Sequence, residues 1–251
     1  MARSVVYAGT DRCGHCLLPP RWCVCEGIPA VVNPLRVEVL LHRREQWRPT
    51  STGKLIERVF EGARSHVFRT DALPDPVAVV CPDRELWILH PRGEPLANVN
   101  LPIPDASRIQ VLLLDGSWNE AGQMLRGVEK WGRPVRLTLA GTSRYWLREQ
   151  QGEGQFSTVE ALLHLLGALG QNEAETRLRL HFELHVYASL RTRGHKALAM
   201  EYLATSPIRE ALPELLERLH ARRPNLISLG MPRAAAFGAS SEDQQRGGGD
   251  G

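Results

Sequence analysis

Residues 109–118 read IQVLLLDGSW, and this stretch decides the fold. Its first six residues are the most apolar strand candidate in the chain, which predicts a strand buried on both sides of a sheet. Further strands are predicted at residues 36–42, 77–80, 86–89 and 135–139. Helices are predicted at residues 52–63, 119–129, 158–169, 173–190 and 208–222. Apolar strands separated by helices predict an α/β fold, with a mostly parallel sheet covered by helices.

The chain divides by composition into four segments. A leader at residues 1–12 is predicted to be flexible, and a Gly-, Ser- and Gln-rich tail at 239–251 is predicted to be disordered. Residues 13–34 form a small cysteine module, and residues 35–225 form the main α/β domain. Ligands of parallel sheets bind outside the carboxyl ends of the strands, which directs attention to three loops. These loops are residues 42–53, 115–118 and 140–158.

The composition is that of an ordinary globular protein, with 251 residues of which 43% are hydrophobic and 24% charged. No apolar run reaches the ~20 residues of a membrane span, and the first residues lack a secretory pattern. We therefore expect a cytoplasmic protein with no membrane partner. A net charge of +3 is compatible with RNA binding without indicating it. The chain has neither a Walker A loop nor a G-x-G-x-x-G fingerprint, which disfavours nucleotide hydrolysis and NAD chemistry.

Four cysteines crowd the start of the chain in the pattern C-x2-C…C-x-C: Cys13, Cys16, Cys23 and Cys25. Two close pairs joined by a short loop can bring four thiolates to one tetrahedral ion, which predicts a closed structural zinc site. The alternative is a pair of disulfides. It is disfavoured because the chain has no secretory pattern and Cys81 would remain unpaired.

Asp115 ends the strongest strand, where partial desolvation can tune a carboxylate toward the strength of a general base. Gly116 lets backbone approach a ligand closely, and Trp118 offers a flat face to a nucleobase. The alternative is a simple turn in which Ser117 caps the next helix and Trp118 lies in the core.

Three further motifs fall in the same loops. Residues 141–148 read GTSRYWLR, a combination of residues that can bind the phosphates and bases of a nucleic acid. The alternative is a surface loop anchored by its aromatic residues. Residues 157–161, STVEA, begin a helix whose free N–H groups can receive a carboxylate, although capping alone also explains them. Residues 42–45 read HRRE. His181 and His185 are expected to form a packed or solvated helix face rather than a metal pair.

Together these motifs resemble the DTW-domain family. Its members carry, in order, C-x2-C…C-x-C, H-P-x-E, D-x-T-W, S-x-Y-x-x-R and S-T-x-E-A. The counterparts here are the four cysteines and residues 42–45, 115–118, 143–148 and 157–161, in matching order and spacing. Ser117 replaces the threonine of the third motif, and Arg43 replaces the proline of the second.

The resemblance implies a tRNA-uridine aminocarboxypropyltransferase. Such an enzyme moves the 3-amino-3-carboxypropyl group of S-adenosylmethionine to N3 of a tRNA uridine. The resemblance also implies a fold related to the SPOUT methyltransferases, in which a C-terminal knot holds the cofactor. We therefore expect a monomer that uses S-adenosylmethionine, acts on tRNA and carries a structural zinc ion.

The resemblance and the chemistry of the loops together assign roles to individual residues. The predicted catalytic residues are Asp115, as base or orienting group, Ser117 and Trp118. The predicted cofactor-binding residues are Leu112, Leu114, Gly116, Leu139, Gly141, Thr142, Ser157, Thr158 and Glu160. The predicted RNA-binding residues are His42, Arg44, Arg144, Tyr145 and Arg148. The predicted zinc ligands are Cys13, Cys16, Cys23 and Cys25.

Two other functions stay open at this point. One is a SPOUT-type RNA methyltransferase with the same cofactor, and the other is a non-catalytic, zinc-bearing RNA-binding protein. The catalytic and cofactor motifs disfavour the second, since a binding protein has no use for them.

Overall fold

The fold is built on a sheet of parallel strands, which confirms the predicted class. The computed structural model describes residues 11–99, 105–148 and 154–222. The five strands lie in the order β2-β1-β4-β3-β5, and every neighbouring pair is parallel. The strands are β1 (Arg36–His42), β2 (Arg64–Phe68), β3 (Glu85–Pro95), β4 (Ile109–Asp115) and β5 (Arg133–Arg136).

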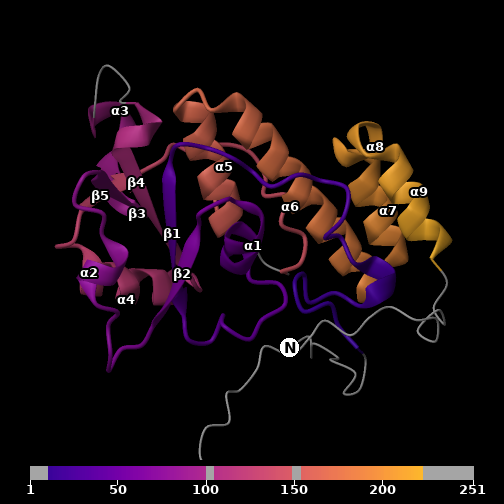
Figure 1. Ribbon diagram of the computed structural model, residues 1–251, viewed down its shortest axis with the longest axis horizontal. Helices are drawn as coiled ribbons and strands as arrows, with labels where there is room; N and C mark the ends of the chain where they lie inside the picture. The colour runs from indigo at the N-terminus through magenta and orange to yellow at the C-terminus, as the bar shows by residue number, and fades with distance from the viewer. Residues whose placement is uncertain (1–10, 100–104, 149–153, 223–251) are drawn as a thin grey trace, which may run out of the picture.

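Helices cover both faces of this sheet (Figure 1). The α-helices are α1 (Thr52–Val59), α2 (Pro76–Val79), α3 (Leu96–Val99), α4 (Trp118–Val128), α5 (Thr158–Ala168), α6 (Asn172–Thr192), α7 (Lys196–Ala204), α8 (Ile208–Ala211) and α9 (Pro213–Ala221). Two short 3-10 helices are η1 (Pro20–Trp22) and η2 (Ala106–Arg108).

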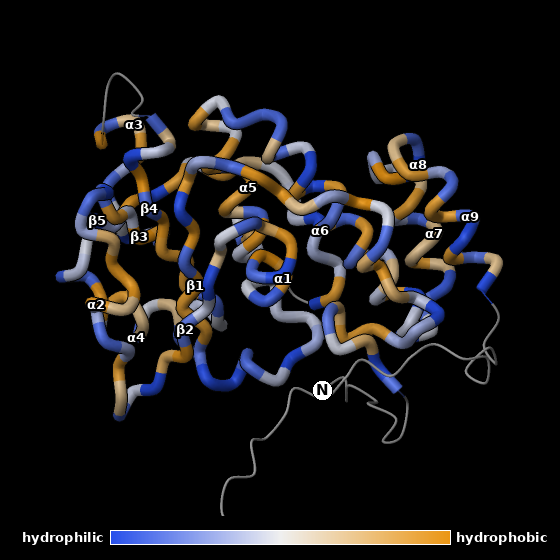
Figure 2. Tube along the Cα trace, in the orientation of Figure 1, coloured by the Kyte–Doolittle hydropathy of each residue, from blue (hydrophilic) through white to orange (hydrophobic). Residues whose placement is uncertain are grey.

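Alternation along β4 divides the interior into two apolar cores. Leu113 points to the larger core, which includes residues of α1, α5 and α6, and Leu112 points to the smaller core with Met124 of α4. Successive side chains of a strand point to opposite faces, so α1 and α5 cover one face and α4 covers the other. The central strands consequently run through the apolar interior (Figure 2).

The helices that follow β1 and β4 leave these neighbouring strands toward opposite faces of the sheet. Two neighbouring strands connected in this way form a topological switch point, where parallel sheets open a crevice for a ligand. Gly53 permits the tight packing beside it, because a Cβ there would lie 2.8 Å from Leu41 and Val39 and 2.9 Å from Asp115. The start of α1 therefore lies directly against the end of β4.

The cysteine module packs on the C-terminal helices. The Trp22 ring lies 6.3 Å from Tyr187 of α6 and 6.2 Å from His220 of α9. Cys16 and Leu18 are buried within the larger core. Residues from both ends of the described chain therefore share one interior.

One predicted strand is wrong: residues 77–80 form most of helix α2 and its C-cap. The apolar run suggested a strand, but Pro76 occupies the first helical turn and the Asp75 carboxylate accepts a hydrogen bond from Val77 N at 3.0 Å. Tertiary contacts stabilise this turn, because the buried Gln110 amide donates to Val79 O at 2.7 Å.

Several predicted boundaries also differ from the structure. The helix predicted at 208–222 is divided into α8 and α9 at Pro213, since proline cannot donate the next helical hydrogen bond. The helix predicted at 52–63 ends at Val59, and the last predicted strand ends at Arg136. Strand β2 and helix α7 were not predicted. The tail at 239–251 and all but the last two residues of the leader at 1–12 lie outside the described residues.

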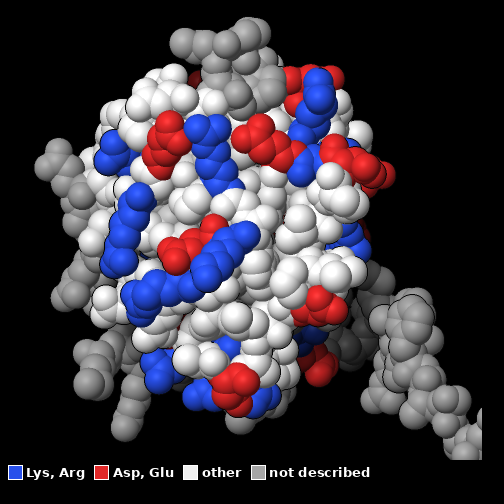
Figure 3. Space-filling model, turned by 90° about the vertical axis from the view of Figure 1, so that its left-hand side faces the viewer, with Lys and Arg blue, Asp and Glu red and all other residues white. Residues whose placement is uncertain are grey.

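The surface carries charges of both signs. On the end of the molecule turned to the viewer in Figure 3, Lys and Arg side chains form a diagonal band with Asp and Glu side chains beside it. None of the described helices is both long and apolar enough to span a membrane.

Candidate active site and metal centre

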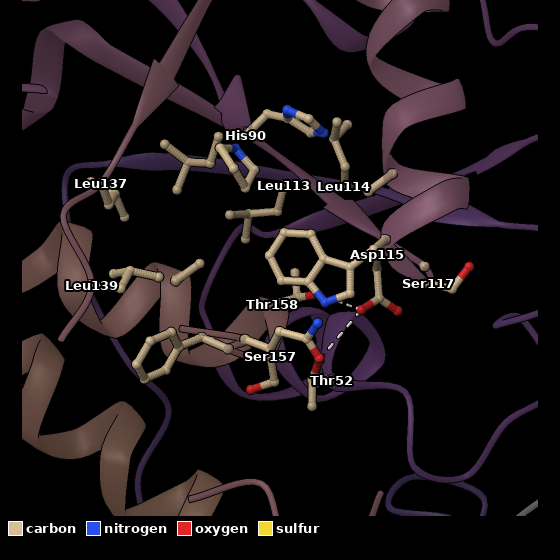
Figure 4. A pocket seen from close by; sticks show the side chains of 18 of the residues that line it. Thr52, His90, Leu113, Leu114, Asp115, Ser117, Leu137, Leu139, Ser157 and Thr158 are labelled. Atoms are coloured by element: carbon tan, nitrogen blue, oxygen red, sulfur yellow. Dashed lines mark hydrogen bonds between the residues drawn. The ribbon is translucent and has the colours of Figure 1, made fainter. Parts of the chain in front are cut away.

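A cavity of about 360 Å³ lies at the carboxyl ends of β3, β4 and β5, where the first helical residues of α1 and α5 also meet. This volume lies in the range of small-molecule sites. Figure 4 shows Leu137 and Leu139 on one side of the cavity and Asp115 with Ser117 on the opposite side. The cavity therefore has an apolar end and a polar end.

The Asp115 carboxylate is the centre of the polar end, although it is only 3% exposed. Its Oδ2 accepts a hydrogen bond from Ser51 Oγ at 2.8 Å. Its Oδ1 accepts from Thr158 Oγ1 at 2.6 Å and from Thr52 Oγ1 at 3.4 Å. Each carboxylate oxygen has two lone pairs, so these bonds occupy Oδ1 and leave one lone pair on Oδ2. This lone pair can accept a proton.

Helix α5 begins at the cavity with a capping box. Ser157 Oγ accepts from Glu160 N, and the Glu160 carboxylate accepts from Ser157 N at 2.7 Å. The amides of Thr158 and Val159 precede the first residue that can donate within the helix. Such amides, together with the helix dipole, form a site for a carboxylate.

Glu160 itself has a structural role. Its carboxylate accepts from Ser143 Oγ at 2.9 Å and from Arg144 N at 2.6 Å, which ties the loop after β5 to α5. The capping alternative from the sequence is therefore confirmed for Ser157 and Glu160, and it leaves the free amides available.

The DGSW turn, residues 115–118, caps helix α4 and leaves the Trp118 side chain exposed. Ser117 caps α4 in a second capping box with Glu120, which confirms the capping alternative for Ser117. Trp118 is 47% exposed and lines the cavity, so the alternative that placed it in the core is wrong. The indole is open to solvent because it occupies the first helical position, beside the mouth of the cavity.

The GTSRYWLR loop divides its residues between the framework and the cavity. Tyr145 lines the cavity, is 2% exposed and donates from its hydroxyl to Thr50 O at 2.5 Å, and burial raises its pKa. Arg148 also lines the cavity and donates to Glu45 Oε2 at 3.1 Å. Arg144 instead binds Glu183 at 2.8 and 3.0 Å, which assigns this guanidinium to the framework.

The HRRE segment lies beside a second hollow that shares Ser117 with the cavity. His42 Nδ1 lies 3.0 Å from a Glu120 carboxylate oxygen, and burial lowers the pKa of His42. The Arg44 side chain is 68% exposed at this hollow. Glu45 is fully buried between Arg48 and Arg148, and burial raises the pKa of Glu45.

The cavity brings together only part of the predicted cofactor set. Its lining includes Leu114, Gly116, Leu139, Ser157 and Thr158. Four predicted residues are not part of that lining: Leu112, Gly141, Thr142 and Glu160. Leu112 is fully buried in the smaller core and lies farther from the carboxyl end of β4 than Leu113 and Leu114, which both line the cavity.

His90 and Thr52 are lining residues that the sequence did not single out as site residues. His90 follows the apolar part of β3, so the rule for strand ends was the signal that could have found it. His90 Nδ1 accepts from Arg92 N at 3.1 Å, which places the proton of the neutral ring on Nε2. Burial lowers the pKa of His90, which favours this neutral ring.

The four N-terminal cysteines form a candidate metal centre. Their sulfur atoms all lie within 4.8 Å of one another, with 3.6 Å between Cys13 and Cys25 and 3.7 Å between Cys16 and Cys23. Tetrahedral zinc with ~2.3 Å bonds to sulfur places its ligands ~3.8 Å apart, so the set fits zinc. All four are free thiols, which contradicts the disulfide alternative.

The electrostatics around the sulfur atoms also suit a cation. Hydrogen bonds from Cys23 and Cys25 lower the pKa of Cys16, whereas the bond to Cys16 raises the pKa of Cys25. Four close thiols cannot all ionise unless a cation neutralises them. Arg58 of α1 is near enough to interact electrostatically with all four.

The two histidines of α6 pack against the framework. His181 Nε2 lies 2.9 Å from Pro29 O. His185 is 1% exposed, and neither ring nitrogen has a hydrogen-bond partner among the described residues.

Comparison with known proteins supports the family resemblance. The sequence profile of the DTW domain matches residues 10–190. The chain belongs to the DTW-domain family. tRNA-uridine aminocarboxypropyltransferase 2 of Drosophila melanogaster is 24% identical to this DTW-domain chain over 186 residues, which cover 70% of the chain and 72% of the fly protein. No solved structure matches the chain significantly.

Proposed function

We propose that the protein transfers the 3-amino-3-carboxypropyl group of S-adenosylmethionine to N3 of a uridine in tRNA. The observation that carries the proposal is the cavity at the switch point, which places the Asp115 carboxylate opposite an apolar end. The family and the printed name of the fly relative supply the reaction class.

The residues of the cavity fit such a cofactor. Leu114, Leu137 and Leu139 offer apolar surface to an adenine ring. The amides of Thr158 and Val159 would receive the carboxylate of the amino acid end. When bound, S-adenosylmethionine supplies a carbon activated by a sulfonium, whose bond to sulfur breaks as the bond to N3 forms, and neutral methylthioadenosine leaves.

Asp115 performs the proton transfer in this proposal. The imide N–H of uracil must lose its proton before or during attack, and the free lone pair of Asp115 Oδ2 accepts it. The neutral leaving group requires no general acid. The remaining work is orientation, because the carbon that reacts must face N3.

Other residues hold the substrates in place. We assign the RNA contacts to Tyr145 and Arg148, which line the cavity, and to His42 and Arg44, which line the adjoining hollow. Glu160 and Arg144 act indirectly, because they fasten the loop after β5. Ser117 and Gly116 shape the turn that presents Trp118.

The zinc ion has a structural role in the proposal. Four cysteine ligands leave no open coordination position for chemistry. We include in the proposal a cytoplasmic monomer with a SPOUT-like knot, which size measurement and an experimental structure with bound cofactor would test.

Mass analysis of nucleosides tests the reaction directly. Unmodified tRNA is incubated with the purified chain and S-adenosylmethionine, digested and compared with a sample that lacks the cofactor. The expected product is a uridine heavier by about 101 Da, since that is the mass of the transferred group. A uridine heavier by only about 14 Da would identify a methyltransferase and contradict the proposal.

A further inference from the structure

We propose that Trp47 is a stacking platform for an unpaired tRNA nucleobase that neighbours the target uridine. This inference rests on the proposed function for its RNA partner. Trp47 lies between β1 and α1, at the carboxyl edge of the sheet where the cavity opens. The proposal gives a role to a residue outside every motif that the chain shares with its family.

The exposure of Trp47 is unusual for its residue type. Its relative exposure is 80%, compared with 47% for Trp118 and 0% for Trp87. An indole left in water forgoes the burial that normally stabilises a fold. The indole of Trp47 is therefore accessible to a partner, and nucleobases stack on aromatic side chains of this kind.

The segment that carries Trp47 is fastened on both sides. Before it, the buried Glu45 carboxylate pairs with Arg148 at 3.1 Å. After it, Thr50 O accepts the Tyr145 hydroxyl at 2.5 Å, and Ser51 Oγ donates to Asp115 at 2.8 Å. Backbone hydrogen bonds of 3.0 Å, from Arg48 N to Glu45 O and from Ser51 N to Arg48 O, complete the turn. The segment thus presents an outward-facing indole from a pinned backbone.

The surroundings of the indole are positively charged. Lys54 Nζ lies 5.9 Å from the centroid of the Trp47 ring. Arg43 and Arg44 are exposed on the same segment, and the Arg44 side chain lines the hollow next to the cavity. Aromatic faces interleaved with Lys and Arg are the recurrent surface for single-stranded nucleic acid, whose bases stack while phosphates meet the cations.

The size of the cavity indicates that the bases next to the target uridine lie outside it. A cavity of about 360 Å³ has the size of a small-molecule site, so we expect it to hold the cofactor and the reacting uracil, with the flanking nucleotides outside. The chain of the RNA must therefore leave the cavity at its rim. The segment that carries Trp47 connects the two hollows, because Arg44 lines the smaller one and Thr52, the first residue of α1, lines the cavity.

Binding of unmodified tRNA by four variants of the full chain tests the proposal, with fluorescence anisotropy as the measurement at constant ionic strength. Trp47→Ala and Trp47→Leu are expected to weaken binding about ten-fold, the usual effect of losing one stacked base. Trp47→Phe keeps an aromatic face and is expected to stay within about three-fold of the wild type. Leu198→Ala, at an exposed apolar residue on α7, is the control and is expected to bind like the wild type.

Three results would overturn the inference. Wild-type affinity in Trp47→Ala would mean that no base stacks there. Wild-type affinity in Trp47→Leu would mean that the RNA contact needs only an apolar side chain and no stacked aromatic face. S-adenosylmethionine affinity, measured by calorimetry, is expected to be equal in all variants, and its loss in Trp47→Ala would likewise contradict a role confined to RNA.

The nucleoside assay separates this inference from the proposed function. Product from the wild type together with unchanged tRNA binding by Trp47→Ala would refute the stacking role and leave the reaction standing. Absence of product from the wild type, together with weakened tRNA binding by Trp47→Ala, would refute the reaction and support the stacking role.

Discussion

Replacing Asp115 by asparagine removes one negative charge from the cavity and preserves the size of the side chain. The fold should tolerate the change, because the three hydroxyl groups that now donate to the carboxylate can also accept from an amide. The substitution therefore separates the charge and basicity of Asp115 from its shape.

The structural cost follows from the hydrogen bonds. Two of them are short, from Thr158 at 2.6 Å and from Ser51 at 2.8 Å, and the third, from Thr52, is long at 3.4 Å. A bond to a charged acceptor is worth about 1 kcal/mol more than a neutral one, so two short bonds predict a loss of about 2 kcal/mol. For a chain of this size that loss lowers the thermal midpoint by about 4–8 °C.

The catalytic effect should be far larger. Loss of a general base reduces the rate of the transfer step by about 100- to 10,000-fold. Single-turnover transfer to tRNA, followed by nucleoside mass analysis, measures this step, while calorimetry measures cofactor affinity. We expect Asp115→Asn to bind S-adenosylmethionine nearly normally and to transfer poorly.

Ser51→Ala is the matched control. It removes the hydrogen bond to Asp115 Oδ2 and a cap of α1, so a stability loss of about 1–2 kcal/mol is expected. Ser51 does not line the cavity, and the charge of Asp115 stays in place. Transfer by Asp115→Asn at the rate of Ser51→Ala would refute the base role and reduce Asp115 to a framework residue.

Three further predictions concern the metal centre, the packing of the sheet and the response to pH. Serine at both Cys13 and Cys25 is expected to abolish zinc binding and to destabilise the fold by several kcal/mol, measured by metal analysis and thermal melting; retained zinc would contradict the tetrathiolate site. Gly53→Ala is expected to destabilise the fold by about 2–3 kcal/mol, because its Cβ would lie 2.8 Å from side chains of β1. Gly167→Ala, in open space on α5, is expected to be stabilising by about 0.5–1 kcal/mol, and equal melting temperatures for the two alanine variants would count against the packing argument. Burial lowers the pKa of His185 to about 3. Below pH ~6.5 the unfolded chain therefore gains a proton at this residue that the folded chain does not. The free energy of unfolding is expected to fall on acidification by up to ~1.4 kcal/mol per pH unit. In His185→Leu, the free energy of unfolding measured by urea titration is expected to lose this part of its pH dependence. An unchanged slope would show that the residue is not held neutral.

Local rules were sufficient where a pattern and its structural result lie within a few residues. The STVEA motif predicted the start of α5, and the alternative in which Ser117 caps the next helix is confirmed at α4. Both helix starts have capping boxes. The apolar run at 109–114 predicted β4 for the same reason. The cysteine spacing predicted a four-sulfur cluster, since its ligands lie close together along the chain.

Local rules failed where a distant contact decides the result. Residues 77–80 are apolar enough for a strand, yet the Gln110 side chain and the position of Pro76 select a helical turn. The intramolecular partner of Arg144 was equally unpredictable, because Glu183, which binds its guanidinium, is 39 residues away. No local pattern could predict either partner, because each comes from another element across the fold.

The sequence by itself therefore determined the α/β class, the capped helix starts, the cysteine site and the identity of Asp115 as the polar residue at a strand end. Only the tertiary structure decided that Asp115 meets Ser51 and Thr158, 64 and 43 residues away, and that His90 faces the same cavity. It also decided that Trp47 stays in solvent. The physical reason is range: hydrogen bonding and periodicity act over one or two turns of chain, whereas burial and side-chain partners depend on how the packed elements meet.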